Sequence, residues 1–399
     1  MAEIASDPRE QEKVRLWQAA NDLEPRRPMV FADPQGAWPE LEAAWLELQC
    51  TDPGLHWMEG ELRRRLLRHE HIPDDYPIVD LFDVPIPVTG DRYEDYGLAP
   101  RAEASPEPRG AYRIQAVIQR EEDAARLRPR PIRLDPQAGQ RTAELAHDLF
   151  GDQLRVRVVG KTAWRYGLTR VLVHWLGLEQ MLLDLYDRPG LVHRLMAFLR
   201  DDFLAEIELL ERERAISLNN QPHYICGTGG LMPTADLPAA GYQGTPRAAD
   251  CICWGESQET VGVGPALFGE FVLQYQLPLL RRFGLVAYGC CEPLDHILDL
   301  LLENVPNLRW VAVSPWANRE RLAERLGGRY VYVYKPNPSL ICSPQPDWEG
   351  AEREIAGTLA IARGCPLHIV MKDTHTLCNE PERITRWADM ARRLAEESL

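Results

Sequence analysis

Residues 285–338 read "LVAYGCCEPLDHILDLLLENVPNLRWVAVSPWANRERLAERLGGRYVYVYKPNP", and this stretch decides the fold. Apolar strand patterns at 285–291, 308–316 and 329–338 alternate with helical patterns at 293–306 and 318–327. The connections between them are short. Strict alternation of nearly continuous apolar strands with helices is typical of a parallel sheet covered by helices.

The same alternation extends over about 250 residues at the C-terminal end of the chain, including a short strand pattern at 215–220, and gives about six strand–helix units there. Earlier strand patterns at 76–88 and 111–119 raise the number of strands to about eight, which favours a closed barrel over an open sheet. Residues 1–70 have Trp and Leu at helical spacing. We therefore predict an α/β protein: a (β/α)8 TIM barrel as the catalytic domain, residues 76–399, after an N-terminal helical extension, residues 1–75.

The overall charge and composition exclude several classes of partner. The chain has 45 Lys and Arg against 60 Asp and Glu, a net charge of −15, so a nucleic acid would be repelled. No apolar run reaches the roughly 18–20 residues of a membrane span. The start, "MAEIASDPREQEKVRLW", is charged from residue 3 and lacks the apolar segment of a signal peptide. We expect a cytoplasmic protein with no membrane or nucleic-acid partner.

The nine cysteines are an odd number spread along the chain, which does not indicate a disulfide framework. In a reducing cytoplasm they are core residues, metal ligands or nucleophiles. An adjacent pair, Cys290 and Cys291, ends a predicted strand. Because successive strand residues point to opposite faces, we expect only one of the two thiols to face a site.

In a barrel of this type the active site lies at the carboxyl ends of the strands. Reading those ends in order gives a set of residues that can titrate, bind a metal or stack: Asn219 and Asn220, Glu256, Cys290 to Glu292, Ser314 to Trp316, Lys335 and Asn337, and Asp373, His375 and Cys378. Loops are often polar for no functional reason, but thiols, Glu, Lys and His carry more chemistry than ordinary loop residues. We therefore predict that these strand ends together form a functional rim.

Two cysteines at separate strand ends, Cys290 (or Cys291) and Cys378, suggest an open zinc site. Two thiolates and one further ligand leave a coordination position free for a substrate. The third ligand is Glu256, His375 or Glu292, all on the same predicted rim. The alternative is that each cysteine is a small buried hydrophobic residue.

With these residues in view, the chain resembles the uroporphyrinogen decarboxylase superfamily, which includes zinc-dependent, corrinoid-linked methyltransferases. The likeness covers roughly residues 150–399. It is carried by "DRPGLVHRLMAFL", "YGCCEPL" and "DTHTLCNEPERITRWADMARR". In the methyltransferase branch a strand ends in His-x-Cys and a later cysteine completes the zinc site. Cys290 and Cys378 match these two cysteines, whereas Tyr288 replaces the histidine, and we favour Glu256 as the third ligand. The match implies that Cys290 is the thiol that faces the site and that Cys291 packs outward.

The resemblance implies a methyltransferase in which zinc polarises the heteroatom that carries the methyl group of a small methylated substrate. A corrinoid (cobalamin) would accept the methyl group. No corrinoid-binding segment follows "DTHTLC", so the corrinoid would come on a partner protein. We predict Asn220, Tyr288, Trp316 and Asn337 as substrate-binding residues, and a homodimer contact is one possible role of residues 1–150.

A second hypothesis is a metal-free lyase or decarboxylase acting on a small carboxylated substrate. Glu256 and His375 would be its acid/base pair, and Lys335, the only cation that the sequence places on the rim, would hold the carboxylate. The arginine-bearing motif of uroporphyrinogen decarboxylase itself is missing, and "PRRPMVFADP" resembles it only weakly. A third hypothesis is a non-catalytic small-molecule binding protein on the same fold.

Overall fold

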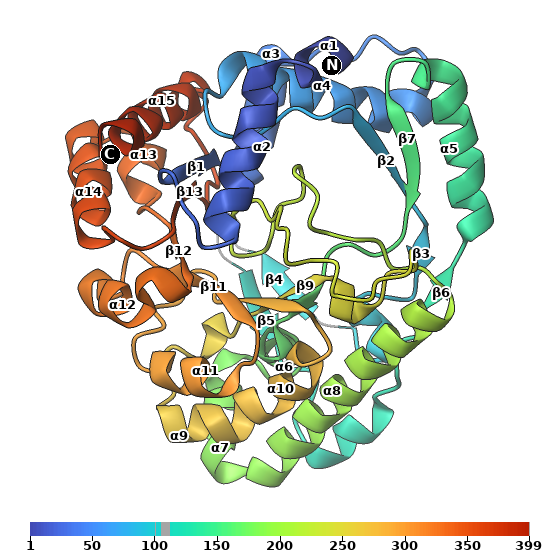
Figure 1. Cartoon of the computed structure of the whole chain (residues 1–399). Helices are drawn as coiled ribbons and strands as arrows, with labels where there is room; N and C mark the ends of the chain where they lie inside the picture. The colour runs from blue at the N-terminus through green and yellow to red at the C-terminus, as the bar shows by residue number, and fades with distance from the viewer. Residues whose placement is uncertain (100, 105–111, 399) are drawn as a thin grey trace.

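The computed structural model describes residues 1–99, 101–104 and 112–398 and contains a seven-stranded parallel sheet surrounded by helices (Figure 1). The strand order is β1 (Met29–Ala32), β13 (Leu367–Met371), β12 (Val331–Tyr334), β11 (Leu308–Val313), β10 (Leu285–Tyr288), β9 (Ile252–Gly255) and β8 (Arg165–Tyr166). All six pairings are parallel. The α/β fold predicted from the alternation is confirmed, and the arrangement is compatible with a TIM-like barrel.

Outside this sheet, β2 (Leu81–Pro85) pairs in parallel with β7 (Arg155–Val159). The short strand β8 follows β7 along the chain and pairs with β9, so residues 155–166 contact β2 at one end and β9 at the other. Two small antiparallel pairs complete the strands: β3 (Val88–Thr89) with β6 (Arg133–Leu134), and β4 (Arg101–Ala104) with β5 (Tyr112–Gln115).

The helices in the described residues are α1 (Ala2–Ala5), α2 (Pro8–Asn21), α3 (Trp38–Trp45), α4 (His56–His71), α5 (Pro136–Phe150), α6 (Leu168–Leu176), α7 (Leu178–Asp187), α8 (Pro189–Arg212), α9 (Pro265–Phe268), α10 (Gln274–Leu280), α11 (Leu298–Asn304), α12 (Arg319–Leu326), α13 (Ser339–Cys342), α14 (Trp348–Ile361) and α15 (Glu382–Glu397). A π-helical turn, Gly269–Leu273, joins α9 to α10. None of them is both long and apolar enough to cross a membrane.

Three expectations about the strands were wrong. The N-terminal extension is not only helical, because β1 lies in it and pairs with the last strand, β13. The strand expected at 111–119 begins outside the described residues and otherwise lies in the antiparallel β4–β5 pair rather than in the main sheet. The strand expected at 215–220 is reduced to a single parallel bridge between Lys161 and Ile216, since the Asn219 side chain inserts at the following positions and bonds the backbone of Thr162 and Ile252.

Strand residues alternate between two apolar layers. In β10, Val286 and Tyr288 belong to the outer layer under the helices, whereas Leu285 and Ala287 belong to an inner cluster. Helix α2 adds Trp17 to that inner cluster and lies beside β1 and β13 (Figure 1). Its last residue, Asn21, accepts from the Trp310 indole and from Arg309, both near the start of β11, so α2 covers the end where this strand begins.

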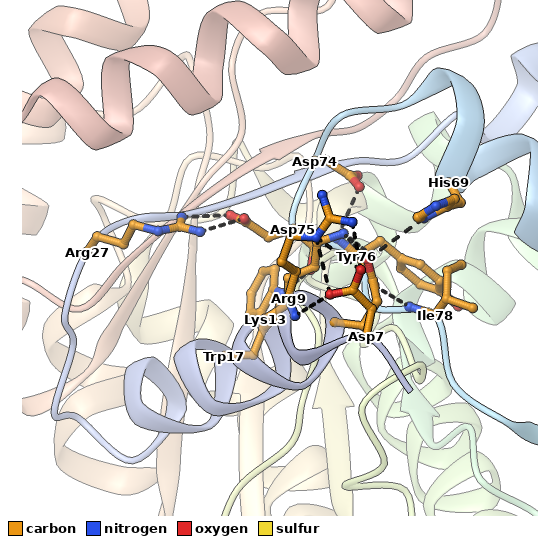
Figure 2. A network of polar contacts seen from close by, with 11 residues as sticks. Asp7, Arg9, Lys13, Trp17, Arg27, His69, Asp74, Asp75, Tyr76 and Ile78 are labelled. Carbon is orange, nitrogen blue, oxygen red and sulfur yellow. Dashed lines mark hydrogen bonds and ion pairs between the residues drawn. The ribbon is translucent and has the colours of Figure 1, made fainter. Parts of the chain in front are cut away.

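A network of buried charges ties α2 and β1 into place (Figure 2). The carboxylates of Asp75 and Asp74 accept the backbone N–H groups of Val30 and Ala32, both at 2.8 Å, along the edge of β1 that faces away from β13. Arg27 pairs with Asp75 and Arg68 with Asp74, each at 2.6 Å. These side chains occupy the hydrogen-bonding groups that an edge strand would otherwise leave free.

Candidate functional site

The carboxyl ends of β10, β12 and β13 meet at one rim. Lys335, directly after β12, donates from Nζ to the Cys290 carbonyl oxygen at 2.5 Å. Cys291 Sγ lies 2.8 Å from Asp373 Oδ2, just after β13. Lys335 is only 2% exposed, so its charge acts in a region with little water. Cys290 and Lys335, which the sequence placed at two separate strand ends, are in contact here.

Both thiols of the adjacent cysteine pair lie in this region, and the expectation that Cys291 packs outward was wrong. The two Sγ atoms are 3.3 Å apart. The strand ends at Tyr288, and Gly289 then takes a φ of +92°, so the alternation of strand side chains no longer applies at 290 and 291. An added Cβ at Gly289 would lie 3.0 Å from Ala312 Cβ, and this close approach together with the positive φ favours glycine there.

The pKa values of the two thiols are shifted in opposite directions. The hydrogen bond from Cys291 and the charge of Lys335 lower the pKa of Cys290, against the effect of burial, whereas the same contact with Cys290 raises the pKa of Cys291. The buried Glu292 accepts the backbone N–H of Cys290 at 2.8 Å and that of Ser257 at 3.2 Å. Burial raises the pKa of Glu292.

A pH titration tests the role of Lys335 in this pair. The absorbance of the Cys290 thiolate at ~240 nm is obtained as the difference between the wild type and Cys290→Ser. This absorbance should rise at a lower pH than that of an ordinary thiol. Lys335→Met removes the neighbouring positive charge and should move this transition to higher pH. An identical transition in both chains would contradict the assigned role of Lys335.

Glu256, predicted as a zinc ligand or general base, is held by an arginine. Arg165 Nε donates to Glu256 Oε1 at 2.5 Å, and Gln258 Nε2 donates to Oε2 at 2.8 Å. The Arg165 guanidinium carbon also lies 4.5 Å from the centre of the Trp254 ring, a cation–π contact. Glu256 and Trp254 therefore fix the position of Arg165.

Arg165 and Trp254 line a cavity of about 350 Å³, which we call the inner cavity. Lys372, the residue that follows β13, is its second cation and donates from Nζ to the Gly227 carbonyl oxygen at 2.9 Å. The described residues lining it are Thr162–Arg165, Asn219, Tyr224–Gly227, Met232, Ile252–Trp254 and Lys372. This set contains two cations and no Asp or Glu, although the chain is acidic overall.

A second cavity, of about 710 Å³, shares Tyr224 and Ile225 with the inner cavity and holds a polar group that the sequence analysis missed. Asp83, on β2, accepts from Tyr224 Oη at 2.5 Å and from His223 Nε2 at 3.0 Å. Burial opposes ionisation of Asp83, but these two bonds and the charge of Arg157 lower its pKa to about 2. Burial lowers the pKa of His223. The presence of a carboxylate inside the apolar run 76–88 was the sequence signal that could have identified Asp83.

Several predicted site residues have structural contacts elsewhere. Tyr288 is fully buried in the outer layer and donates to Gln276 Oε1 at 2.7 Å. Asn220 Nδ2 bonds the carbonyl oxygens of Thr234 and Leu237 at 3.2 and 2.7 Å, which holds a loop.

Two further predicted residues lie at the surface or at a helix start. Trp316 is 68% exposed. The Asn337 side chain accepts from the backbone N–H and the hydroxyl of Ser339, the first residue of α13. Neither residue is among those that line the inner cavity.

The three predicted zinc ligands do not come together in this structure. Cys378 Sγ donates to the Cys342 carbonyl oxygen at 3.3 Å, Glu256 is paired with Arg165, and His375 is exposed. Within residues 1–99, 101–104 and 112–398, no group of three or more His, Cys, Asp or Glu side chains is arranged to hold a metal ion. As arranged here, these residues do not fit a zinc centre, and we derive no step through zinc.

No family model matches this chain, and a search of curated proteins found no match.

Proposed function

We propose that this protein is a metal-independent carboxy-lyase, in the decarboxylase class, that acts on a small carboxylated substrate bound in the inner cavity. The observation that carries the proposal is the lining of that cavity, in which Arg165 and Lys372 are the charged groups. Buried cations bind carboxylates through charge-assisted hydrogen bonds. The indoles of Trp164 and Trp254 and the side chain of Met232 give the cavity apolar walls, which suit an aromatic acid.

Each cation has hydrogen-bonding capacity left for a substrate. Glu256 engages Nε and Nη2 of Arg165, and among the described residues Nη1 has no acceptor. Lys372 gives one of its three N–H groups to Gly227. In our proposal Arg165 holds the retained carboxylate, and Glu256 is a positioning residue rather than the base.

The proposed substrate carries two carboxylates, one held by Arg165 and the other beside Lys372. The reaction would break the bond between the substrate carbon and the carboxylate beside Lys372, releasing carbon dioxide and leaving the electron pair on carbon. The ammonium of Lys372 stabilises that developing negative charge and supplies the proton that replaces the carboxylate. Lys372 is 8% exposed, and low exposure to water strengthens its electrostatic effect.

We further propose that the strands close into an eight-stranded (β/α)8 barrel made of β1, β2, β7 with β8, and β9 to β13. Observed strand pairings support every pair of neighbouring strands in this barrel except β1 with β2. Helix α4 spans that gap, because Arg68 donates to the Ala32 carbonyl oxygen at 3.0 Å and Arg65 to the Leu81 carbonyl oxygen at 2.5 Å.

Binding of a carboxylate and its neutral isostere tests the proposal. Isothermal titration with benzoate and with benzamide should give at least tenfold tighter binding for benzoate, since one charge-assisted hydrogen bond contributes about 1.5–3 kcal/mol. Carbon dioxide release is then measured on aromatic and aliphatic carboxylic acids in the presence of EDTA. Equal affinity for benzoate and benzamide, together with no release from any acid, would refute the carboxy-lyase.

Zinc-dependent methyl transfer to a corrinoid on a partner protein stays a prediction of the family resemblance. One observation favours it: the pKa of Cys290 is lowered by its contact with Cys291 and by Lys335, and the thiolate is the form that binds metals. Elemental analysis of the purified chain tests it. With zinc present, transfer from methoxylated substrates to cob(I)alamin is followed by the corrinoid spectrum.

A further inference from the structure

The contact between Cys290 and Cys291 points to a binding site of its own, independent of the carboxy-lyase proposal. We propose that these two thiols form a chelating site for a monosubstituted trivalent arsenical. Two sulfur ligands on one trivalent arsenic atom lie side by side in near contact. The two Sγ atoms are already in that relation, 3.3 Å apart.

The backbone around the pair is fixed on both sides. The N–H of Cys290 donates to Glu292 at 2.8 Å, and its carbonyl oxygen accepts from Lys335 at 2.5 Å. Cys291 Sγ is held 2.8 Å from Asp373 Oδ2. A ligand therefore meets two thiols already oriented toward each other, and little ordering free energy is lost when the second bond forms.

The chemistry requires neither an oxidant nor a reductant. With methylarsonous acid, CH3As(OH)2, two As–O bonds break and two As–S bonds form. Each thiol proton leaves with one hydroxide, so two water molecules are released, and arsenic remains trivalent. Asp373 lies within hydrogen-bond distance of the Cys291 thiol and can accept its proton as the As–S bond to Cys291 forms, before that proton leaves with the displaced hydroxide as water.

Access is compatible with a small reagent. Cys291 is half-buried and Cys290 is 5% exposed, so the first bond would form at Cys291 and the second at Cys290. Closing the ring is then intramolecular, and a chelate should outlast a single As–S bond by about 10²-fold or more. Excess glutathione, a monothiol, should leave it in place, whereas a small dithiol should remove it.

The experiment uses the full reduced chain with methylarsonous acid. Intact mass spectrometry should find one CH3As group replacing two hydrogen atoms, and the number of titratable thiols should fall by two. Cys290→Ser and Cys291→Ser should each lose the glutathione-resistant adduct. Peptide mapping of the wild type should locate the arsenic on the peptide that contains residues 290 and 291, and this measurement needs no variant.

The matched control is Cys342→Ser, since Cys342 and Cys378 are a second pair of neighbouring cysteines, with Cys378 Sγ 3.3 Å from the Cys342 carbonyl oxygen. This variant should keep the adduct. The proposal is overturned if Cys342→Ser abolishes the adduct while Cys290→Ser retains it, or if glutathione strips the arsenical from the wild type. Neither result bears on carboxylate binding in the inner cavity, which benzoate titration measures separately.

Discussion

Replacing Lys372 by methionine should lower the affinity for benzoate by about 10- to 100-fold and kcat/KM of the proposed decarboxylation by about 10²- to 10³-fold. Methionine keeps the length and apolar stem of lysine but removes the charge that faces the inner cavity. The loss should be greater in kcat than in KM, because the proposed role of Lys372 is greatest when negative charge develops on carbon. Calorimetry and steady-state kinetics of carbon dioxide release measure the two effects.

Lys335→Met is the matched control for that experiment. Lys335 is also a buried lysine at the end of a parallel strand, but its Nζ bonds the Cys290 carbonyl oxygen and it does not line the inner cavity. Its replacement should leave benzoate affinity within about threefold of the wild type. Loss of benzoate binding in Lys335→Met but not in Lys372→Met would move the carboxylate site to the rim, as the sequence alone predicted.

Removing the carboxylate of Asp75 should reduce the free energy of unfolding by about 3–5 kcal/mol, the range for breaking a buried ion pair. In Asp75→Ala the Arg27 guanidinium loses its partner, and the backbone N–H of Val30 at the edge of β1 loses its acceptor (Figure 2). Asp75 is 2% exposed, so water cannot replace the lost oxygen atoms without entering the core. Urea denaturation followed by circular dichroism measures the change.

Glu349→Gln provides the comparison, because Glu349 pairs with Arg353 at 3.4 Å on a surface where both side chains are largely exposed. Such pairs contribute little, and the denaturation midpoint should not move. If Asp75→Ala unfolds at the same urea concentration as Glu349→Gln, the network at β1 does not hold the N-terminal segment to the sheet.

The main sheet was predictable where one physical signal dominates. Strands β9 to β13 are buried on both faces, so each appears in the sequence as a continuous apolar run between helices. β1 was missed because its four residues, "MVFA", lie between charged segments and its edge is completed by side chains of Asp74 and Asp75 rather than by another strand. No local sequence pattern predicts that side chains will complete the edge of a strand in this way.

The residues at the strand ends were predictable from the sequence, whereas the inner cavity proposed as the carboxylate site was not. Glu256, Cys290 and Lys335 were expected at strand ends, because this expectation requires only that the end of each strand be located in the sequence. The partner of Glu256 is Arg165, 91 residues earlier on a two-residue strand, and such a pairing depends on the folded geometry. Lys372 could have been found, since it continues the inward-facing series His368 and Val370 along β13.

Helix α2 also has a consequence for the order in which the chain acquires its structure. The amide of Asn21 bonds the Leu231 carbonyl oxygen, 210 positions later, and its oxygen accepts from the Trp310 indole, 289 positions later. β1 then pairs with β13, the last strand. Helix α2 and β1 are therefore synthesised long before their partners, and pairing at such separations is slow. We expect nascent chains that end before β13 to expose the apolar side of α2 and to be the forms of this protein most dependent on chaperones.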